Sequence, residues 1–411
     1  MIFTTGLLSS SWALVPINLI LEYRMNTHEN MRVRASQKKE INEKMQIGLL
    51  LREARDEADR GKRHNLFINA LTRARKHGAV DLEVEALSLA VLFNIGTGDV
   101  RQLVGLFWPY FAELKETVLG LGDQSQKHLH LWAAERILYF APEFHEIPLH
   151  EVEKAMEGWL AAIDARGGYG RQGFLRLRLH HSLRFGLLAK SSSLMRALEA
   201  VEPESALSPS PGRLPGEVSE DDGGGGQAVA FGCTAYANQL RVLYHCSAGN
   251  AHAAWRCARY LVEGRSACDL ALCAVAPREA LATLLEPLSR AGMVQEAAGA
   301  HARGLSMVLG APEVSGFFGH HLRYMVRTGA HAQARIHLDT VLAPSGETRS
   351  LKCTPFHRFH FLRGAIAVLR VDEKDAQRVT VLVQEASVLA QKFDERNGGN
   401  AFEQMLAGDT N

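Results

Sequence analysis

The chain has 411 residues, of which 46% are hydrophobic and 22% are charged. A single hydrophobic core stops growing near about 250–300 residues, so this length excludes one compact core and predicts two lobes or an elongated stack. The 46 lysines and arginines nearly balance the 45 aspartates and glutamates, which argues against a dedicated nucleic-acid-binding protein because such proteins carry a basic surplus.

The first 24 residues are mostly apolar. The run from Ile2 to Tyr23 contains one charge, Glu22, and is interrupted by polar residues and by Pro16. It has neither the basic start and small-residue cleavage site of a signal peptide nor the clean apolar length of a spanning helix. We therefore expect residues 1–35 to be an N-terminal extension, disordered or in part a mis-assigned start, with translation beginning at Met25 or Met31. A weak membrane anchor is the alternative.

From about Ile41 onward, apolar residues recur at steps of three and four. Such steps place side chains on one side of an α-helix, and the surrounding residues are good helix formers. Three of these stripes are Leu82-Ala86-Leu89-Phe93, Leu281-Leu284-Leu285-Leu288 and Val379-Leu382-Val383-Ala386. Short glycine-containing breaks separate them, so the sequence predicts an all-α fold of antiparallel helix pairs.

One stretch interrupts the helical pattern. Residues 203–227 contain four prolines, six glycines and an acidic cluster, a composition that cannot bury apolar surface. We expect a flexible linker there, with an N-terminal helical lobe at 36–202, a C-terminal helical lobe at 228–397 and a disordered tail at 398–411.

A repeated unit occurs in the C-terminal half. A glycine at a turn is followed five residues later by alanine, in the pairs Gly249 and Ala254, Gly292 and Ala297, and Gly329 and Ala334. The position nine residues after the glycine is apolar in two of the three units. A small residue suits the point where two helices of a pair cross just after their turn. Gly61 and Gly98 mark looser versions of the unit in the N-terminal half.

These segments resemble tetratricopeptide repeats, which place Gly, small and aromatic residues at fixed offsets over about 34 residues. The Gly and Ala positions match in three units, and most aromatic positions do not. The block from Leu285 to Leu342 is similar to segments of large tetratricopeptide-repeat proteins of actinobacteria. The resemblance implies a TPR-like α-solenoid with a concave groove and no catalytic residue. An irregular bundle of helix hairpins is the alternative.

Eighteen histidines raise the question of a metal site. His357 and His360 are spaced to share a helix face, but no third ligand completes a zinc pattern nearby. The sequence has neither a GxxxxGK[ST] phosphate loop nor a GxSxG elbow. We therefore expect no cofactor, no metal and no enzymatic activity, with a hidden active site as a minor alternative.

Basic residues supply the remaining candidates. Arg176, His180 and Arg184 fall at i, i+4 and i+8 on one predicted helix stripe, where they form either a groove for an acidic peptide or an ordinary solvated face. Tyr244, Arg323 and Tyr324 are further candidates for peptide binding. The expected function is a scaffold that binds a protein or peptide of unknown identity through its concave groove. The alternative is a ligand- or peptide-sensing regulator that acts through a partner. The six cysteines, none in a CxxC pair, fit the cytoplasm, and we expect no nucleic-acid or membrane partner.

Overall fold

The computed structural model describes residues 28–95, 104, 108, 115, 118–120, 124–165, 171–201, 234–262, 275–309, 315–342 and 353–410. All regular secondary structure in these ranges is helical, so the predicted all-α class is confirmed. The hypothesis of a late translation start and the predicted linker at 203–227 concern residues outside these ranges. Within them, no helix combines the length and the apolar content that crossing a bilayer would require.

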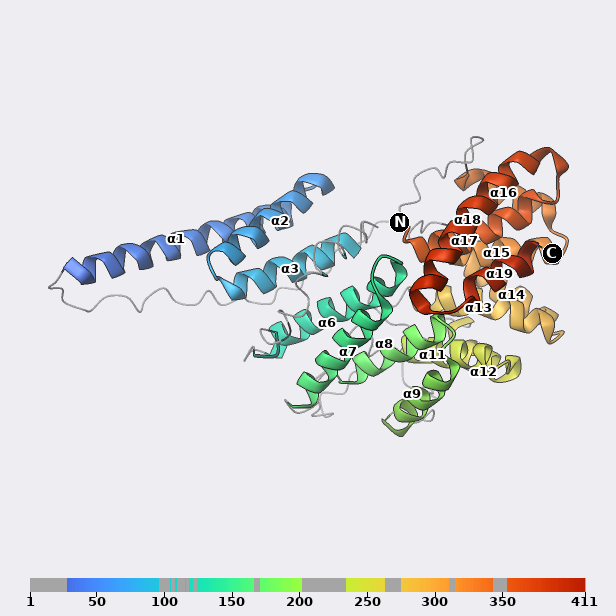
Figure 1. Ribbon diagram of the computed structural model, residues 1–411, viewed down its shortest axis with the longest axis horizontal. Coiled ribbons are helices and arrows are strands. Elements are labelled where there is room, and N and C mark those ends of the chain that lie inside the picture. Colours follow the sequence, from blue (N-terminus) through green and yellow to red (C-terminus); the bar gives the residue numbers. More distant parts are fainter. Residues whose placement is uncertain are drawn as a thin grey trace.

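In Figure 1 the blue helices lie at one end of the long axis, the green helices follow, and the helices from α12 to α19 gather at the other end. The part before residue 202 contains α1 (His28–Asp56), α2 (Arg60–Lys76), α3 (Val80–Ile95), α6 (Gln124–Phe140), the 3-10 turn η2 (Ala141–Glu143), α7 (Leu149–Asp164), α8 (Arg171–Arg184) and α9 (Leu188–Val201). The part after residue 233 contains α11 (Thr234–Ser247), α12 (Ala251–Val262), α13 (Val275–Arg290), α14 (Val294–Val308), α15 (Ser315–Arg327), α16 (His331–Val341), α17 (Pro355–Leu369), η5 (Glu373–Asp375), α18 (Ala376–Asn397) and α19 (Ala401–Thr410).

Glycines with a left-handed backbone form the turns inside the helix pairs. Gly249, Gly292 and Gly329 have φ of 72°, 72° and 79°, a region that side-chain-bearing residues rarely adopt. At Gly292 the amide of Met293 donates to the Leu288 carbonyl at 3.0 Å, and the Gly292 amide donates to the Ser289 carbonyl at 3.2 Å. This pair of bonds ends a helix by satisfying its last carbonyls. The same pair of bonds recurs at Gly78 and Gly186.

The small residue that follows each turn is buried. Ala254, Ala297 and Ala334 are at most 1% exposed. Gly186 and Ser191 form a further unit that the sequence analysis missed, since Ser191 is fully buried five residues after a left-handed glycine. Serine replaces alanine there, so a search for alanine alone passes over it. Gly61, in contrast, is not a turn residue, because it lies in the first turn of α2.

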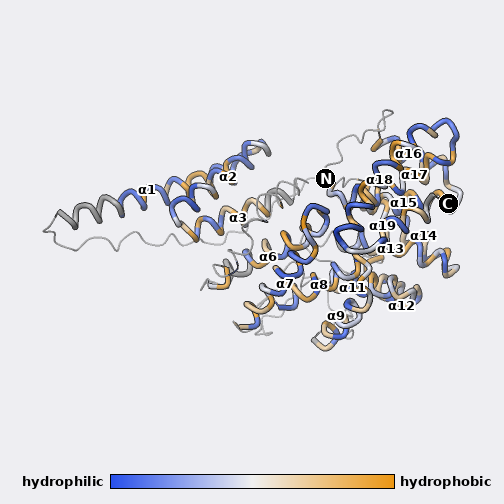
Figure 2. Tube along the Cα trace, viewed as in Figure 1, coloured by the Kyte–Doolittle hydropathy of each residue, from blue (hydrophilic) through white to orange (hydrophobic). Residues whose placement is uncertain are grey.

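The first helix of each pair packs on the first helix of the next pair. Contacts run from α6 to α8, α8 to α11, α11 to α13, α13 to α15, α15 to α17 and α17 to α19. Orange apolar segments alternate with blue polar ones along these helices in Figure 2, as expected for helices with one buried side. One hydrophobic cluster extends from Ile47 to Tyr324 and so contains residues from both sides of 202–233. A second cluster consists mainly of residues of α15 to α19 and also includes Ala282 of α13 and Leu305 and Val308 of α14.

Residues near both ends of the described part are more regular than expected. Residues 28–35 belong to α1 and not to a disordered extension, and 401–410 form α19 where a disordered tail was predicted. Two features hold α19 in place. The Asp394 carboxylate accepts hydrogen bonds from the Phe402 and Glu403 amides at 3.0 and 2.8 Å. The Phe402 ring stacks on Phe393 with centroids 4.7 Å apart. This side-chain cap and aromatic anchor fix a short helix that sequence periodicity alone does not reveal.

The backbones of α15 and α17 approach each other closely. A Cβ atom added to Gly319 would overlap the His360 carbonyl oxygen and lie 2.8 Å from the Phe361 Cα. Both obstacles are backbone atoms, which cannot rotate away. We expect Gly319→Ala to lower the free energy of unfolding by about 3 kcal/mol, the upper end of the usual cost of overpacking. Urea unfolding followed by circular dichroism measures the loss.

Gly299→Ala in α14 is the matched control, because a Cβ atom there meets no heavy atom within 4 Å. We expect it to raise stability by up to about 1 kcal/mol, as alanine does at an open position inside a helix. Equal effects of the two substitutions would contradict the close packing of α15 on α17.

Candidate functional site

The first helices of successive pairs surround a cavity of about 850 Å³, which we call the inner pocket. This volume lies within the range of about 300–1,000 Å³ typical of small-molecule sites. Its lining includes Arg184 on α8, Leu243 and Cys246 on α11, Glu279, Thr283, Glu286 and Arg290 on α13, Phe317, His320 and Arg323 on α15, Phe356, His357, His360 and Arg363 on α17, and Met405 on α19.

One wall of the inner pocket is apolar. Phe317 and Phe356 contribute aromatic rings from α15 and α17, Leu243 contributes an aliphatic side chain from α11, and Met405 approaches from α19. The C-terminal helix thus forms part of the pocket's boundary, which depends on the Asp394 cap described above. An apolar wall with a few polar groups is the usual composition of a ligand pocket.

Histidines form a second part of the lining. The rings of His320 and His360 stack with centroids 5.2 Å apart. Burial lowers the pKa of His320 to about 3, and burial, reinforced by the neighbouring His320 and Arg363, holds the pKa of His360 well below its ordinary value. Both rings are therefore neutral at pH 7. In the described part of the chain, no three His, Cys, Asp or Glu side chains are grouped so as to hold a metal ion.

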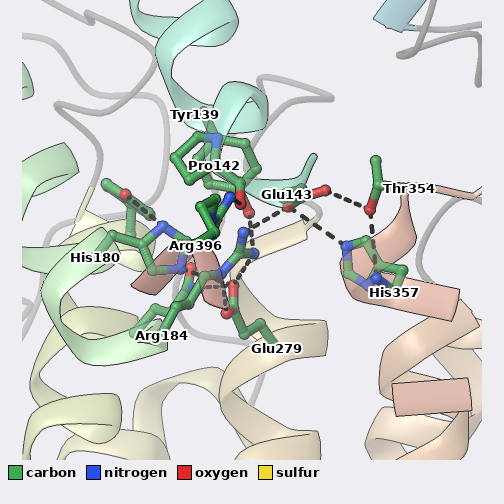
Figure 3. A network of polar contacts seen from close by, with 11 residues as sticks. Tyr139, Pro142, Glu143, His180, Arg184, Glu279, Thr354, His357 and Arg396 are labelled. Carbon is green, nitrogen blue, oxygen red and sulfur yellow. Dashed lines mark hydrogen bonds and ion pairs between the residues drawn. The ribbon is translucent and has the colours of Figure 1, made fainter. Parts of the chain in front are cut away.

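The floor of the pocket is a buried network centred on Arg184, shown in Figure 3. The Arg184 guanidinium donates to both carboxylate oxygens of Glu279, at 2.8 and 2.9 Å, and to the hydroxyl of Tyr139 at 2.9 Å. It also donates to a carboxylate oxygen of Glu143 on η2. The side chains of Arg184, Glu143 and Glu279 are nearly inaccessible to water, so the charges are paired inside the protein.

The network extends from these three charges in two directions. Towards α11, His180 Nε2 lies 3.0 Å from Glu279, Tyr236 contacts the other nitrogen of the same ring at 3.0 Å, and Gln239 donates to Glu279 at 2.6 Å. Towards α17, the Thr354 hydroxyl donates to Glu143 at 2.8 Å. The network therefore joins α6, α8, α11, α13 and α17 beneath one pocket.

The charges in the network stabilise one another against burial. Burial alone would raise the pKa of Glu279, but the charge of Arg184 and the contacts with His180 outweigh it and hold that pKa well below its ordinary value. Burial likewise opposes the charge on Arg184, yet Glu279 and its neighbours raise the Arg184 pKa well above the usual range. The pair remains ionised at neutral pH.

Close to the network, Arg396 on α18 binds the turn that carries Glu143. Its guanidinium donates to the backbone carbonyls of Pro142 and Phe144 at 2.8 and 3.0 Å, as Figure 3 shows for Pro142. Burial lowers the pKa of Arg396 to about 10. A side chain from the last long helix thus fixes the position of a carboxylate near the middle of the chain.

The structure separates the six residues that the sequence analysis selected for peptide binding. Arg184 and Arg323 line the inner pocket. Arg176 and His180 share the stripe of Arg184, as expected, but both are buried, because helices cover nearly all sides of α8. Arg176 and His180 therefore form neither a peptide-binding groove nor a solvated face.

The two tyrosines lie outside the pocket. The Tyr244 hydroxyl donates to Ser192 on α9 at 3.4 Å. Tyr324 is buried, with its ring 4.7 Å from that of His301. Both connect helices of neighbouring pairs. Sequence analysis missed Glu143, Glu279, Gln239 and Tyr139, because no motif or spacing marks them in the sequence.

Comparison with known proteins gives no further assignment. No protein-family model, no curated protein and no solved structure matches this chain.

Proposed function

We propose that this protein is a non-enzymatic binding protein built from TPR-like helix pairs, and that it holds a ligand in the inner pocket. The observation that carries the proposal is the origin of the pocket lining. Five successive first helices, α8, α11, α13, α15 and α17, each contribute side chains to one cavity. Repeat proteins that stack helix pairs use such an inner surface for binding.

The repeated turns support the TPR-like part of the proposal. Left-handed glycines close the pairs at Gly186, Gly249, Gly292 and Gly329, and each is followed five residues later by a buried small side chain. The contacts between consecutive first helices are those expected of an α-solenoid. The division into lobes at 36–202 and 228–397 remains a prediction.

The size of the cavity favours a small molecule or short peptide over a broad protein interface. A cavity of about 850 Å³ can enclose most of a small ligand, whereas a standard protein interface buries about 800 Å² on each partner. Of the two functions expected from the sequence, ligand sensing with a signal passed to a partner is therefore the better supported.

Filling the pocket tests this proposal. Thr283 is half-buried and lines the pocket from α13, so Thr283→Trp places an indole in the cavity. Ala298→Trp adds the same group at an exposed position of α14. Each protein is incubated with a small-molecule and peptide extract of cells that express it, and native mass spectrometry records the bound mass. We expect one adduct mass on the wild type and on Ala298→Trp, with at least tenfold less on Thr283→Trp.

Two results would count against the pocket. Retention of the same adduct by Thr283→Trp would place binding elsewhere. A complete lack of adducts on the wild type would remove support for a ligand-binding role. Circular dichroism of both variants verifies that they keep the helical fold.

A further inference from the structure

An apolar stripe, which we call the α1 stripe, runs along the exposed side of α1. It consists of Ile41, Met45 and Leu49, whose exposed fractions are 54%, 59% and 52%. Steps of four residues place side chains along one side of an α-helix. The opposite side of the same helix is already occupied, because Ile47 and Leu51 are buried in the hydrophobic cluster that α1 shares with α2 and α3.

The first helix lies at the end of the helix stack. Within the described ranges α1 packs mainly on α2 and α3, and it contributes no residue to the lining of the inner pocket. Figure 1 shows it at the end of the molecule where the blue helices lie. The terminal helices of stacked repeat proteins need a polar outer face for solubility. The α1 stripe departs from this rule, and a contiguous exposed apolar surface is typical of an interaction site.

The shape of the α1 stripe suits a second copy of the same helix. Met45, Gly48, Leu49 and Arg52 have the spacing of a four-residue hole that receives one side chain from a facing helix. Gly48 leaves space in this hole, since a Cβ atom added there would meet no heavy atom within 4 Å. Met45 of an antiparallel second α1 fills the hole when it is level with Leu49. Arg52 is then level with Asn42 of the second copy and has no like charge directly opposite.

Charges at the two ends of the α1 stripe favour this antiparallel register. Lys38 precedes Met45 by seven residues and Asp56 follows Leu49 by seven, and seven residues span about two helical turns. Lys38 is therefore level with Asp56 of the second copy, and two-fold symmetry repeats the pair. Both side chains are exposed, and neither forms an ion pair within the described part of the chain. A parallel pairing would instead place Lys38 against Lys38.

We propose that the α1 stripe is a self-association surface, on which a second copy of this chain packs its own α1 in antiparallel orientation. Lys38 of each copy lies beside Asp56 of the other. One pair of helices buries less than the about 800 Å² on each partner of a standard protein interface. The dimer is therefore weak and dissociates on dilution.

Sedimentation equilibrium of the full-length protein over a range of concentrations tests the proposal. The wild type is expected to show a reversible equilibrium between monomer and dimer. Met45→Glu should raise the dimer dissociation constant about tenfold or more, because it places a carboxylate at the centre of the apolar contact. Ile336→Glu is the matched control, since it changes an apolar residue on α16 that is 65% exposed, and it should leave the constant unchanged.

Charge variants test the orientation of the two helices. Lys38→Glu and Asp56→Lys should each raise the dissociation constant about tenfold, because each replaces two attractive pairs by two repulsive ones. An equimolar mixture of the two variants should associate as tightly as the wild type, since every mixed dimer has opposite charges at both ends. Circular dichroism verifies that all variants keep the helical fold.

Three results would overturn the proposal. The first is a wild type that stays monomeric at every concentration, as it would if residues 1–27 or a different protein covered the α1 stripe. The second is a dimer that Met45→Glu leaves unchanged, which would place the contact on another surface. The third is a mixture of the two charge variants that associates no more tightly than either variant alone, which would exclude the antiparallel register.

Discussion

Glu279→Ala is expected to lower the free energy of unfolding by about 3–5 kcal/mol, the usual loss when one partner of a buried ion pair is removed. The substitution removes the carboxylate that accepts hydrogen bonds from Arg184 and Gln239. His180 also lies 3.0 Å from this carboxylate. The Arg184 guanidinium would then remain buried beside fewer acceptors. Urea unfolding at pH 7 measures the loss.

A surface pair provides the matched control. Glu385 accepts two hydrogen bonds from Arg358, both at 2.7 Å, but its side chain is 40% exposed. Because water replaces the lost contacts at an exposed site, Glu385→Ala should reduce stability by less than about 1 kcal/mol. Similar losses from the two substitutions would show that the Arg184 network is not the buried structure described above.

Acid is expected to destabilise the protein between pH 7 and pH 5. Burial lowers the pKa of His130 to about 4 and that of His320 to about 3. The unfolded chain binds protons at these residues below its ordinary pKa of about 6.5, whereas the folded protein does not. Their contribution to stability is thus complete above about pH 6.5 and falls as the pH drops towards 4. Protonation of each histidine in the unfolded chain lowers the free energy of unfolding by about 2 kcal/mol between pH 7 and pH 5.

Unfolding by urea at pH 7, 6 and 5 tests this dependence. His130→Gln should make the fall in the free energy of unfolding shallower, because it removes one of the histidines that the unfolded chain protonates. His252→Gln changes an exposed residue of α12 and is the matched control. The depressed pKa of Glu279 acts in a lower window, because its contribution declines only as the pH falls below about 4.5. Constant stability from pH 7 to pH 5 would contradict the burial of neutral histidines.

The helices and their turns could be predicted because local rules determine them. The apolar stripe of Leu281, Leu284 and Leu288 requires only helical periodicity, and the glycine at 292 requires only the left-handed turn that ends the helix. The all-α class followed from such signals. Ser191 was missed because the fifth position after the turn glycine can hold serine as well as alanine.

The candidate site could not be predicted in the same way, because its residues are distant in sequence. His180 and Glu279 are 99 residues apart, and Glu143 and Thr354 are 211 residues apart. The run of basic residues in α8 is typical of a solvated stripe, yet packing against α6, α7, α9 and α11 buries it. Only the order in which the helices stack brings these side chains together, and no local pattern encodes that order.

The location of a bound ligand tests the central claim most directly. Crystals of the protein grown with the small-molecule and peptide extract described above would provide difference density for the bound ligand. We expect that density among α13, α15 and α17, in contact with Phe317 and Phe356. Density confined to the outer helices α14 and α16, with the inner pocket unchanged, would contradict the account.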